Sequence, residues 1–333
     1  MRIVSLVPEG TPSALYRSLI PMQALALNGH RVHVEERDAV GDPGPLLDVD
    51  VVHIFRLAHQ PAQRLVRQLQ TAGVAVVWDN DFDVGAAPEG HPVARALRGA
   101  TGRRAIEAVN AMIRLADVVT APTEELAERQ LAAGAADVQV FENWLPPTFS
   151  RPRTLPPRGL TIGWAAMAEH EWDFAQLGLR DVLANVLERH LHVRLLGIGA
   201  DVGLRSRRYE HLPWQAYDDL PGLLARCDVL IAPLANVPFN QTRSNVKLKE
   251  YAALGVPWLA SPVGDYSWMG ESEGGRLVAD SDWSAHIEAL VRDEGARRRL
   301  AANGRRWAAG EVVVDHVGEL EQLCEHAAAV ARG

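Results

Sequence analysis

The chain alternates short apolar segments with stretches of helical spacing, and it does so twice, on either side of a proline-rich break. In the first half the helical stretches 15–27 and 62–72 end at Asn28-Gly29 and Gly73, as glycine-capped helices commonly do. Strands that alternate with helices predict a parallel sheet covered by helices. The strands expected in this half are 3–7, 31–35, 51–55, 74–78, 117–121 and 138–141.

Residues 146–158 have little periodicity and are rich in proline, which is typical of a linker. The strand–helix rhythm then restarts at residue 160, with expected strands at 160–164, 193–197, 229–232 and 257–261. The helices expected after the linker are 173–189, 220–226, 246–254, 283–293, 295–309 and 312–330. We therefore predict an α/β chain of two doubly wound domains. Residues 1–147 form the N-terminal domain, 148–158 the linker and 159–310 the second domain. A C-terminal helix at 311–333 follows, which can pack on the N-terminal domain.

The length, net charge and cysteine content of the chain exclude several classes of function. A length of 333 residues suits two α/β domains. A net charge of −8 argues against a general nucleic-acid binder, which needs a basic face. Cys227 and Cys324 are far apart in sequence and form no CxxC pair, so a disulfide framework and a zinc ribbon are not expected. Without a signal-peptide pattern or an 18-residue apolar run, the chain is expected to be cytoplasmic with no transmembrane segment, and a peripheral association with the membrane stays open.

The strongest chemical signal lies between residues 238 and 257, after the strand expected at 229–232. Ser244 or Asn245 can cap a helix whose free N–H groups and dipole suit a diphosphate. Lys247 adds a positive charge in the first turn, and Glu250, three residues on, faces the same side and can accept hydrogen bonds from ribose hydroxyls. The alternative is a surface helix with a Lys–Glu pair and a good cap.

The end of this segment resembles the nucleotide-sugar signature of the group 1, or family 4, glycosyltransferases. In that signature a Glu, seven residues and a second Glu precede a helix of small residues that ends in Gly-x-Pro; Glu250 and Gly255-Val-Pro257 match its second half. The first Glu falls on Thr242, a departure at the position that contacts the sugar. A branch of the family with Asn or Lys and then Ser-x-x-Lys ahead of Glu-Tyr is similar to Asn240 and to Ser244-Asn-Val-Lys247.

This resemblance implies the GT-B fold, in which two Rossmann-like domains face a central cleft. It also implies an enzyme that moves a sugar from a nucleotide-diphosphate sugar to an unidentified small-molecule or glycan acceptor, with retention of anomeric configuration. No cofactor and no divalent metal are expected. Lys247 and His170 are the candidate catalytic residues. The candidate donor-binding residues are Asn240, Thr242, Ser244, Asn245, Lys247, Glu250, Gly163, Gly199 and Trp214.

Two alternatives stay open. Thr242 in place of the family Glu is compatible with a GT-B relative that has lost transfer and acts as a nucleotide-binding partner or scaffold. The glycines from Gly197 to Gly203 are spaced GxGxxxG, which disfavours a nicotinamide-dependent oxidoreductase. A tight turn at Gly199 beside a nucleobase fits this spacing better, and Trp214 can flank that base or belong to the core.

The first domain offers weaker candidates on its acceptor side. His53 is a possible base, although a satisfied core histidine is the commoner role, and for Arg17 and Arg56 a surface charge is favoured. Residues 79–83, Asp-Asn-Asp-Phe-Asp, are similar to the DxD metal site of a different glycosyltransferase fold, but a polar acceptor-side loop containing Asp81 is favoured over a metal. The basic helix expected at 95–115 is read as a solvated outer helix rather than a membrane-surface contact.

Overall fold

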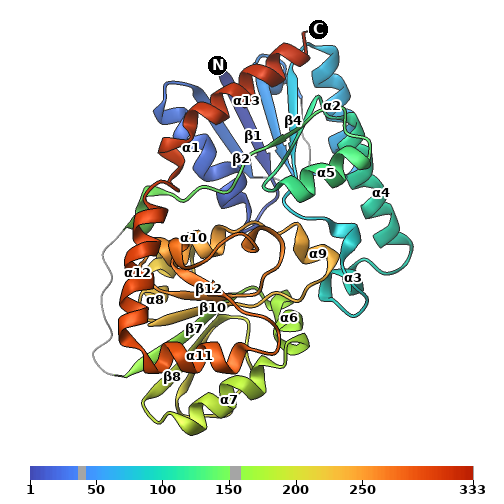
Figure 1. Ribbon diagram of the computed structural model, residues 1–333. Helices are drawn as coiled ribbons and strands as arrows, with labels where there is room; N and C mark the ends of the chain where they lie inside the picture. Colours follow the sequence, from blue (N-terminus) through green and yellow to red (C-terminus); the bar gives the residue numbers. More distant parts are fainter. Residues whose placement is uncertain (37–42, 151–158, 333) are drawn as a thin grey trace. The chain divides into compact units, whose positions relative to one another are not determined.

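The computed structural model describes residues 1–36, 43–150 and 159–332, and the chain divides into two compact units (Figure 1). The first unit comprises Met1–Pro146, Thr242–Ser244 and Val312–Gly333, and the second comprises Pro147–Gln241 and Asn245–Glu311. Most of the predicted linker falls on residues 151–158, outside the described residues. The predicted boundaries at 147, 158 and 310 stay predictions.

A six-stranded parallel sheet in the order β2-β1-β3-β4-β5-β6 forms the centre of the first unit. Its strands are Arg2–Val7 (β1), Arg31–Glu36 (β2), Val51–Phe55 (β3), Ala75–Asp79 (β4), Val118–Ala121 (β5) and Val138–Val140 (β6). Its helices are Ile20–Leu27 (α1), Gln60–Thr71 (α2), Pro92–Ala96 (α3), Gly99–Leu115 (α4), Glu124–Ala132 (α5) and Val317–Val330 (α13).

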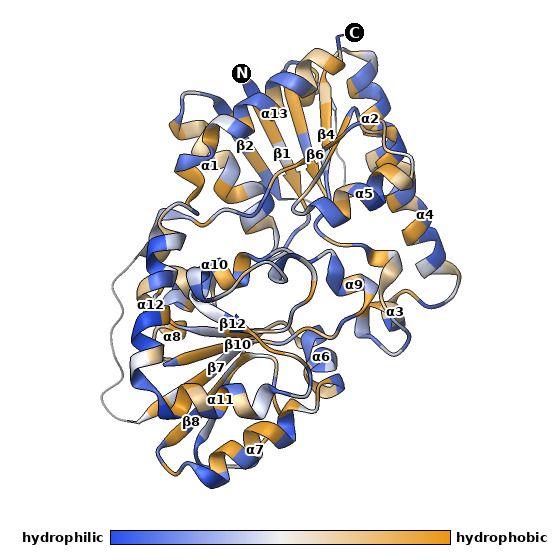
Figure 2. Cartoon of the chain, viewed as in Figure 1, coloured by the Kyte–Doolittle hydropathy of each residue, from blue (hydrophilic) through white to orange (hydrophobic). Residues whose placement is uncertain are grey.

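Helices cover both faces of this sheet, so its central strands are apolar along their whole length. Every residue of β3 and of β4 is buried. One apolar cluster joins the sheet to α2 and α4, and another joins it to α1 and α13. Figure 2 shows the resulting pattern, with hydrophobic strands and helices that are hydrophilic on part of their surface.

The second unit has its own six-stranded parallel sheet, in the order β12-β11-β10-β7-β8-β9. The strands are Leu160–Ala166 (β7), Val193–Gly199 (β8), Tyr209–Leu212 (β9), Val229–Ala232 (β10), Trp258–Ala260 (β11) and Gly275–Leu277 (β12). The helices are Glu171–Gln176 (α6), Leu179–Arg189 (α7), Leu220–Leu224 (α8), Pro238–Gln241 (α9), Val246–Ala253 (α10), Trp283–Arg292 (α11) and Glu294–Ala308 (α12).

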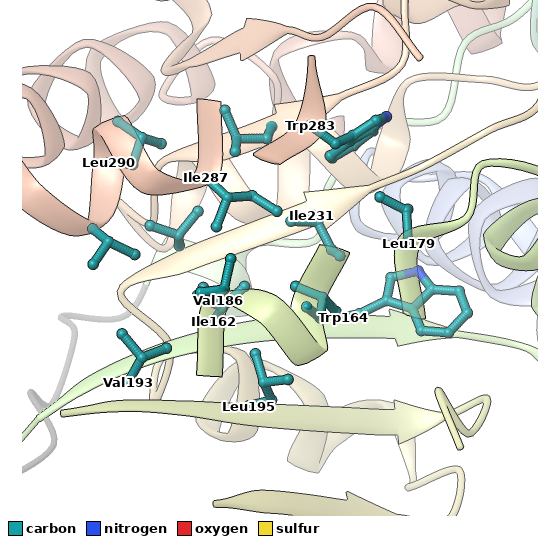
Figure 3. Close-up of a cluster of buried hydrophobic side chains, with 14 of the residues drawn as sticks. Ile162, Trp164, Leu179, Val186, Val193, Leu195, Ile231, Trp283, Ile287 and Leu290 are labelled. Carbon is teal, nitrogen blue, oxygen red and sulfur yellow. The ribbon is translucent and has the colours of Figure 1, made fainter. Parts of the chain in front are cut away.

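Alternate residues of β7 serve the two faces of this sheet. Ile162 and Trp164 pack with α7 and α11 in the cluster of Figure 3, where Trp283 and Ile287 lie above the sheet. Gly163 faces the other way, and a Cβ built on it would lie 2.3 Å from the Cys227 sulfur. The absence of a side chain at 163 therefore lets the segment before β10 pack closely on β7.

Two helices expected to be continuous are each divided. The helix predicted at 95–115 is α3 and α4, because the chain is extended at Arg98 and Gly99 has a φ of +80°. The helix predicted at 173–189 is α6 and α7, separated by Gly178 in the left-handed conformation at φ +62°. Glycine reaches this conformation at little cost, so each break coincides with a glycine inside a helical pattern.

The sequence analysis also missed two strands, β9 and β12, which lie at the two edges of the second sheet. Neither is an apolar run: β9 reads Tyr-Glu-His-Leu with no fully buried residue, and β12 is three residues long. Among the described residues, no helix combines the length and the hydropathy that a membrane crossing requires.

A glycine also explains why α10 ends where it does. Gly255 has a φ of +63°, its N–H donates to the Ala252 carbonyl, and the N–H of Val256 donates to the Tyr251 carbonyl. These two bonds make a Schellman motif, which turns the chain toward Pro257 and β11. The Gly-x-Pro of the sequence signature is thus a helix stop.

We expect Gly255→Ala to lower the free energy of unfolding by about 1–2 kcal/mol, because an L-residue is strained at this φ. Its Cβ would also lie 1.8 Å from an Arg305 guanidinium nitrogen, which must move. Urea denaturation of the full chain measures the change.

Gly222→Ala is the matched control. Gly222 lies within α8, its φ is not positive, and a Cβ built on it meets no atom within 4 Å. It should leave stability unchanged or raise it slightly. Equal effects of the two substitutions would contradict the role given to Gly255.

Candidate functional site

A buried carboxylate, Asp173, joins two loops of the second unit. The loop after β7 supplies His170, whose Nδ1 lies 2.9 Å from Asp173 Oδ2. The loop after β10 supplies two donors to Oδ1: the Ala235 N–H at 3.1 Å and the Asn240 side-chain amide at 2.6 Å. Asp173 itself is fully buried in α6.

These two loops leave the sheet where its winding reverses. From β7 the chain proceeds to β8 and β9 on one side, whereas β10 pairs with the other side of β7. Crevices at such a switch point, outside the carboxyl ends of parallel strands, are where doubly wound sheets bind ligands. Asp173 therefore fixes the geometry at the position in this unit best suited to a ligand.

Hydrogen bonding keeps Asp173 ionised. Burial alone would raise its pKa, but the contact with His170 and the donors of Ala235 and Asn240 hold the pKa below its ordinary value. Since Asn240 also donates to the Ala235 carbonyl at 2.9 Å, its amide group is fixed from two directions. His170 and Asn240, both predicted site residues, are thus brought together by a residue that the sequence analysis did not single out.

In the sequence, α10 follows the loop after β10, and Asn245 is its N-cap. Asn245 does not cap this helix with a side-chain hydrogen bond. Instead Asp265, in the loop after β11, accepts a 3.3 Å bond from the Asn245 N–H. Lys247 in the first turn is half-buried, and Glu250 one turn later is 7% exposed.

The other lysine has a different role. Lys249 is fully buried, and its ammonium lies 2.7 Å from the Glu311 carboxylate. The two lysines of the chain therefore differ in environment, and the pairing of Lys249 anchors α10 to the end of the second unit.

Gly199 and Trp214, predicted to lie near a nucleobase, are neighbours in the second unit. Gly199 ends β8 with a φ of +83°, and a Cβ on it would lie 2.8 Å from the indole ring of Trp214. Trp214 is 39% exposed, so it is not a core tryptophan. Gly163, in contrast, lies within β7 and faces Cys227, as described above.

Thr242 and Ser244 cluster with the first unit. The carbonyl of Thr242 accepts a 3.2 Å hydrogen bond from the Thr123 hydroxyl, and the Ser244 hydroxyl lies 2.8 Å from the Asn143 amide nitrogen. Thr242 is fully buried.

Arg17 and His53 of the first unit are interior residues that share one carboxylate. Arg17, whose surface location was favoured from the sequence, is 2% exposed and binds Asp79 through a 2.6 Å ion pair. His53 accepts or donates a 2.8 Å bond with the Ser5 hydroxyl and lies 3.8 Å from Asp79. Burial alone would raise the pKa of Asp79, but the Arg17 charge and the nearby His53 ring hold it well below its ordinary range. The surface reading of Arg17 is therefore wrong.

Each carboxylate of the 79–83 segment has an arginine partner, which argues against a shared metal. The three ion pairs are Asp79–Arg17 at 2.6 Å, Asp81–Arg56 at 2.5 Å and Asp83–Arg129 at 3.2 Å. Arg56, also read as a surface charge, is 24% exposed and stacks over two phenylalanine rings. Within the described ranges, no group of three or more His, Cys, Asp or Glu side chains is arranged to hold a metal ion. Metal independence itself stays a prediction.

Comparison with known families identifies the second unit. Residues 159–293, which include Asp173, the loop after β10 and α10, match the family model described as "Glycosyl transferases group 1". This match makes the second unit similar to the group 1 glycosyltransferases, over less than half of the chain. The predicted family is thereby confirmed, on the region that holds the candidate donor site.

One curated relative agrees with this similarity. The D-inositol 3-phosphate glycosyltransferase of Salinispora tropica is 33% identical over 126 residues, which are 37% of this chain and 24% of the relative. The matched region therefore spans about a quarter of that curated relative's length.

Solved structures share the fold over the whole chain. A structure of Anabaena HepE in complex with UDP matches with a TM-score of 0.68 at 18% identity, covering 99% of this chain and 100% of its own. The sucrose-phosphate synthase of Thermosynechococcus elongatus matches at 0.70 with 14% identity, covering 98% and 99%. The predicted GT-B fold of two Rossmann-like units is confirmed.

We expect Asp173→Asn to destabilise the second unit by roughly 1–3 kcal/mol, because the new amide presents N–H groups to donors that need an acceptor. The depressed pKa of Asp173 means that its ionised form contributes stability above the ordinary aspartate range and that this contribution is lost as pH falls. Thermal and urea unfolding between neutral and acid pH should therefore show a shallower acid loss in the variant. Asp219→Asn is the control, since Asp219 is exposed and its side chain makes no capping hydrogen bond to α8; equal behaviour of both variants would contradict the role of Asp173.

Asp79→Asn should cost more, about 3–5 kcal/mol, since it leaves the buried Arg17 guanidinium without a counter-charge. Glu294→Gln breaks the exposed pair with Arg298 and should cost at most about 1 kcal/mol. Urea denaturation at neutral pH compares the two. A small effect at Asp79 would show that the first unit does not depend on this buried pair.

Proposed function

We propose that this chain transfers a sugar from a nucleotide-diphosphate sugar to a small-molecule or glycan acceptor, with retention of anomeric configuration. The observation that carries the proposal is that the family match, the sheet's switch point and the start of α10 fall on the same region of the second unit. Support for a uridine nucleotide comes from the Anabaena structure, which contains UDP.

The leaving diphosphate binds at the N-terminus of α10. The helix dipole favours negative charge there, and Lys247 adds an ammonium in the same turn. These groups act most strongly on charge that grows during the reaction, because they are already oriented before bond cleavage. In this proposal they stabilise the diphosphate as the bond to the sugar breaks.

Glu250 binds the ribose, and the surface formed by Gly199 and Trp214 lies against the base. Glu250 is on the same side of α10 as Lys247 and is nearly buried, so its carboxylate is held for two hydroxyl donors. His170 and Asn240, both held by Asp173, approach the sugar. Thr242, where the family signature has Glu, is the position on which the choice of sugar depends.

Retention needs no covalent enzyme intermediate in this scheme. The leaving phosphate itself accepts the proton of the attacking acceptor hydroxyl, so the protein's contribution is to position and to stabilise charge. Arg17 and Asp79 are paired internally, so they support the first unit rather than the chemistry. We further propose that transfer needs no divalent metal and takes place in the cytoplasm.

We expect Lys247→Ala to lower kcat about 100-fold, as the loss of one preorganised charge-stabilising group typically does. The assay follows UDP release from UDP-glucose with a panel of sugar and polyol acceptors. Arg298→Ala, an exposed helix position, is the control and should keep full turnover. Near-normal transfer by the Lys247 variant, with its fold intact, would contradict the assignment.

Glu250→Ala should weaken UDP binding about tenfold, which corresponds to 1.4 kcal/mol and to the loss of hydrogen bonds to a carboxylate. Calorimetric titration of the full chain with UDP and dTDP measures this. The transfer assay, together with this titration, distinguishes a non-catalytic scaffold, because such a protein binds the nucleotide through Glu250 but shows neither transfer nor donor hydrolysis.

A further inference from the structure

An exposed histidine on the edge strand β9 contacts the end of β8. The side chain of His211 is exposed, and its Nε2 atom lies 3.0 Å from the carbonyl oxygen of Gly199. Trp214 lies beside the same glycine, since a Cβ built on Gly199 would be 2.8 Å from the indole ring. Gly199 therefore joins an exposed imidazole to the exposed indole that we have placed near the nucleobase.

The contact with Gly199 determines which nitrogen of the imidazole carries the hydrogen. A carbonyl oxygen only accepts hydrogen bonds, so His211 donates through Nε2. In a neutral imidazole the other nitrogen, Nδ1, is then an acceptor. Within the described ranges of the chain, the ring makes no hydrogen bond besides the one to Gly199. The protein thus presents a hydrogen-bond acceptor in a fixed orientation at the end of β8.

Hydrogen bonds hold the loop after β8 in place, so this arrangement exists before a ligand binds. Tyr209 is two residues before His211 and lies on the same side of β9. Its hydroxyl donates a 2.7 Å bond to Asp201 and accepts a 3.2 Å bond from the Val202 N–H. Burial and the Asp201 carboxylate raise the pKa of Tyr209, which keeps the hydroxyl protonated as a donor. Preorganised groups of this kind bind a ligand at a lower entropic cost.

An acceptor at this position distinguishes between nucleobases. Proteins read an unpaired base through hydrogen bonds to its Watson–Crick edge. On that edge uracil and thymine carry a hydrogen on N3, whereas N3 of cytosine carries a lone pair. The Nδ1 atom of His211 can accept the hydrogen of uracil but is repelled by the lone pair of cytosine. Stacking on Trp214 does not distinguish the bases, because every base has a π face.

We propose that His211 recognises the nucleobase of the donor by accepting a hydrogen bond through Nδ1 from the N3–H of uracil or thymine, while Trp214 stacks on the base. This inference rests on the proposed function, because it requires the base to lie against Gly199 and Trp214. It narrows the donor to a nucleotide of uracil or thymine. His211 sets this specificity and takes no part in the transfer of the sugar.

The test compares UDP with 3-methyluridine 5′-diphosphate, in which a methyl group replaces the hydrogen on N3, by calorimetric titration of the full chain. We expect the methylated nucleotide to bind about tenfold more weakly, because Nδ1 loses its donor. CDP should also bind about tenfold more weakly than UDP. Equal affinities for the three nucleotides, or tighter binding of CDP, would overturn the proposal.

His211→Phe keeps an aromatic ring and removes both nitrogens. It should weaken UDP binding about tenfold and make UDP and the methylated nucleotide bind alike. The ratio of the two affinities does not depend on the fraction of the variant that is folded. His192→Phe is the matched control, since His192 is exposed and precedes β8, at the opposite end of the strand from Gly199. It should keep the preference for UDP, whereas a preference that survives in His211→Phe would contradict the inference.

Inorganic pyrophosphate separates this inference from the donor site on which it rests, because it carries no base. If Lys247→Ala weakens the binding of pyrophosphate and of UDP, but the unmodified chain binds UDP and its methylated form alike, the donor site stands and the inference about His211 fails. If neither ligand depends on Lys247, the donor site fails and the inference fails with it.

Discussion

In the second unit, the Asp173 carboxylate holds together loops that would otherwise be independent. It accepts hydrogen bonds from His170 after β7 and from Ala235 and Asn240 after β10, and these two strands are neighbours at the point where the sheet reverses its winding. A buried carboxylate is costly unless its oxygens are satisfied, so each donor is needed for the fold as well as for the site. The loop after β10 then leads into α10, whose first turn carries Lys247.

The first unit uses the same kind of interaction at a different place. Asp79, at the end of β4, binds the fully buried Arg17. Two further arginines bind the next carboxylates of the segment, Asp81 and Asp83. An alternating acidic sequence that can ligate a metal in another fold is here a set of separate ion pairs. The two units thus share an architecture, but the buried carboxylates Asp79 and Asp173 bind different partners in each.

Much of the fold could be predicted because hydrophobic periodicity records burial directly. The strands β3 and β7 are apolar runs, and glycines mark the ends of helices such as the one before Gly29. The edge strands β9 and β12 could not be predicted, since one-sided pairing needs no apolar run. The breaks in the helices near Gly99 and Gly178 depend on backbone conformation, which a glycine permits but does not require.

The candidate site was predictable where a local pattern carries the chemistry. Lys247 and Glu250 are three residues apart on one helix, so their common side follows from the sequence. Asp173 was missed because its partners His170, Ala235 and Asn240 come from loops up to 67 residues away, and only the folded sheet brings them together.

The most direct test of the donor site is a crystal structure of the full chain with bound UDP. We expect the diphosphate at the N-terminus of α10 within hydrogen-bonding distance of the Lys247 ammonium, and the ribose hydroxyls on the Glu250 carboxylate. UDP bound elsewhere in the chain, or bound with its diphosphate remote from α10, would contradict it.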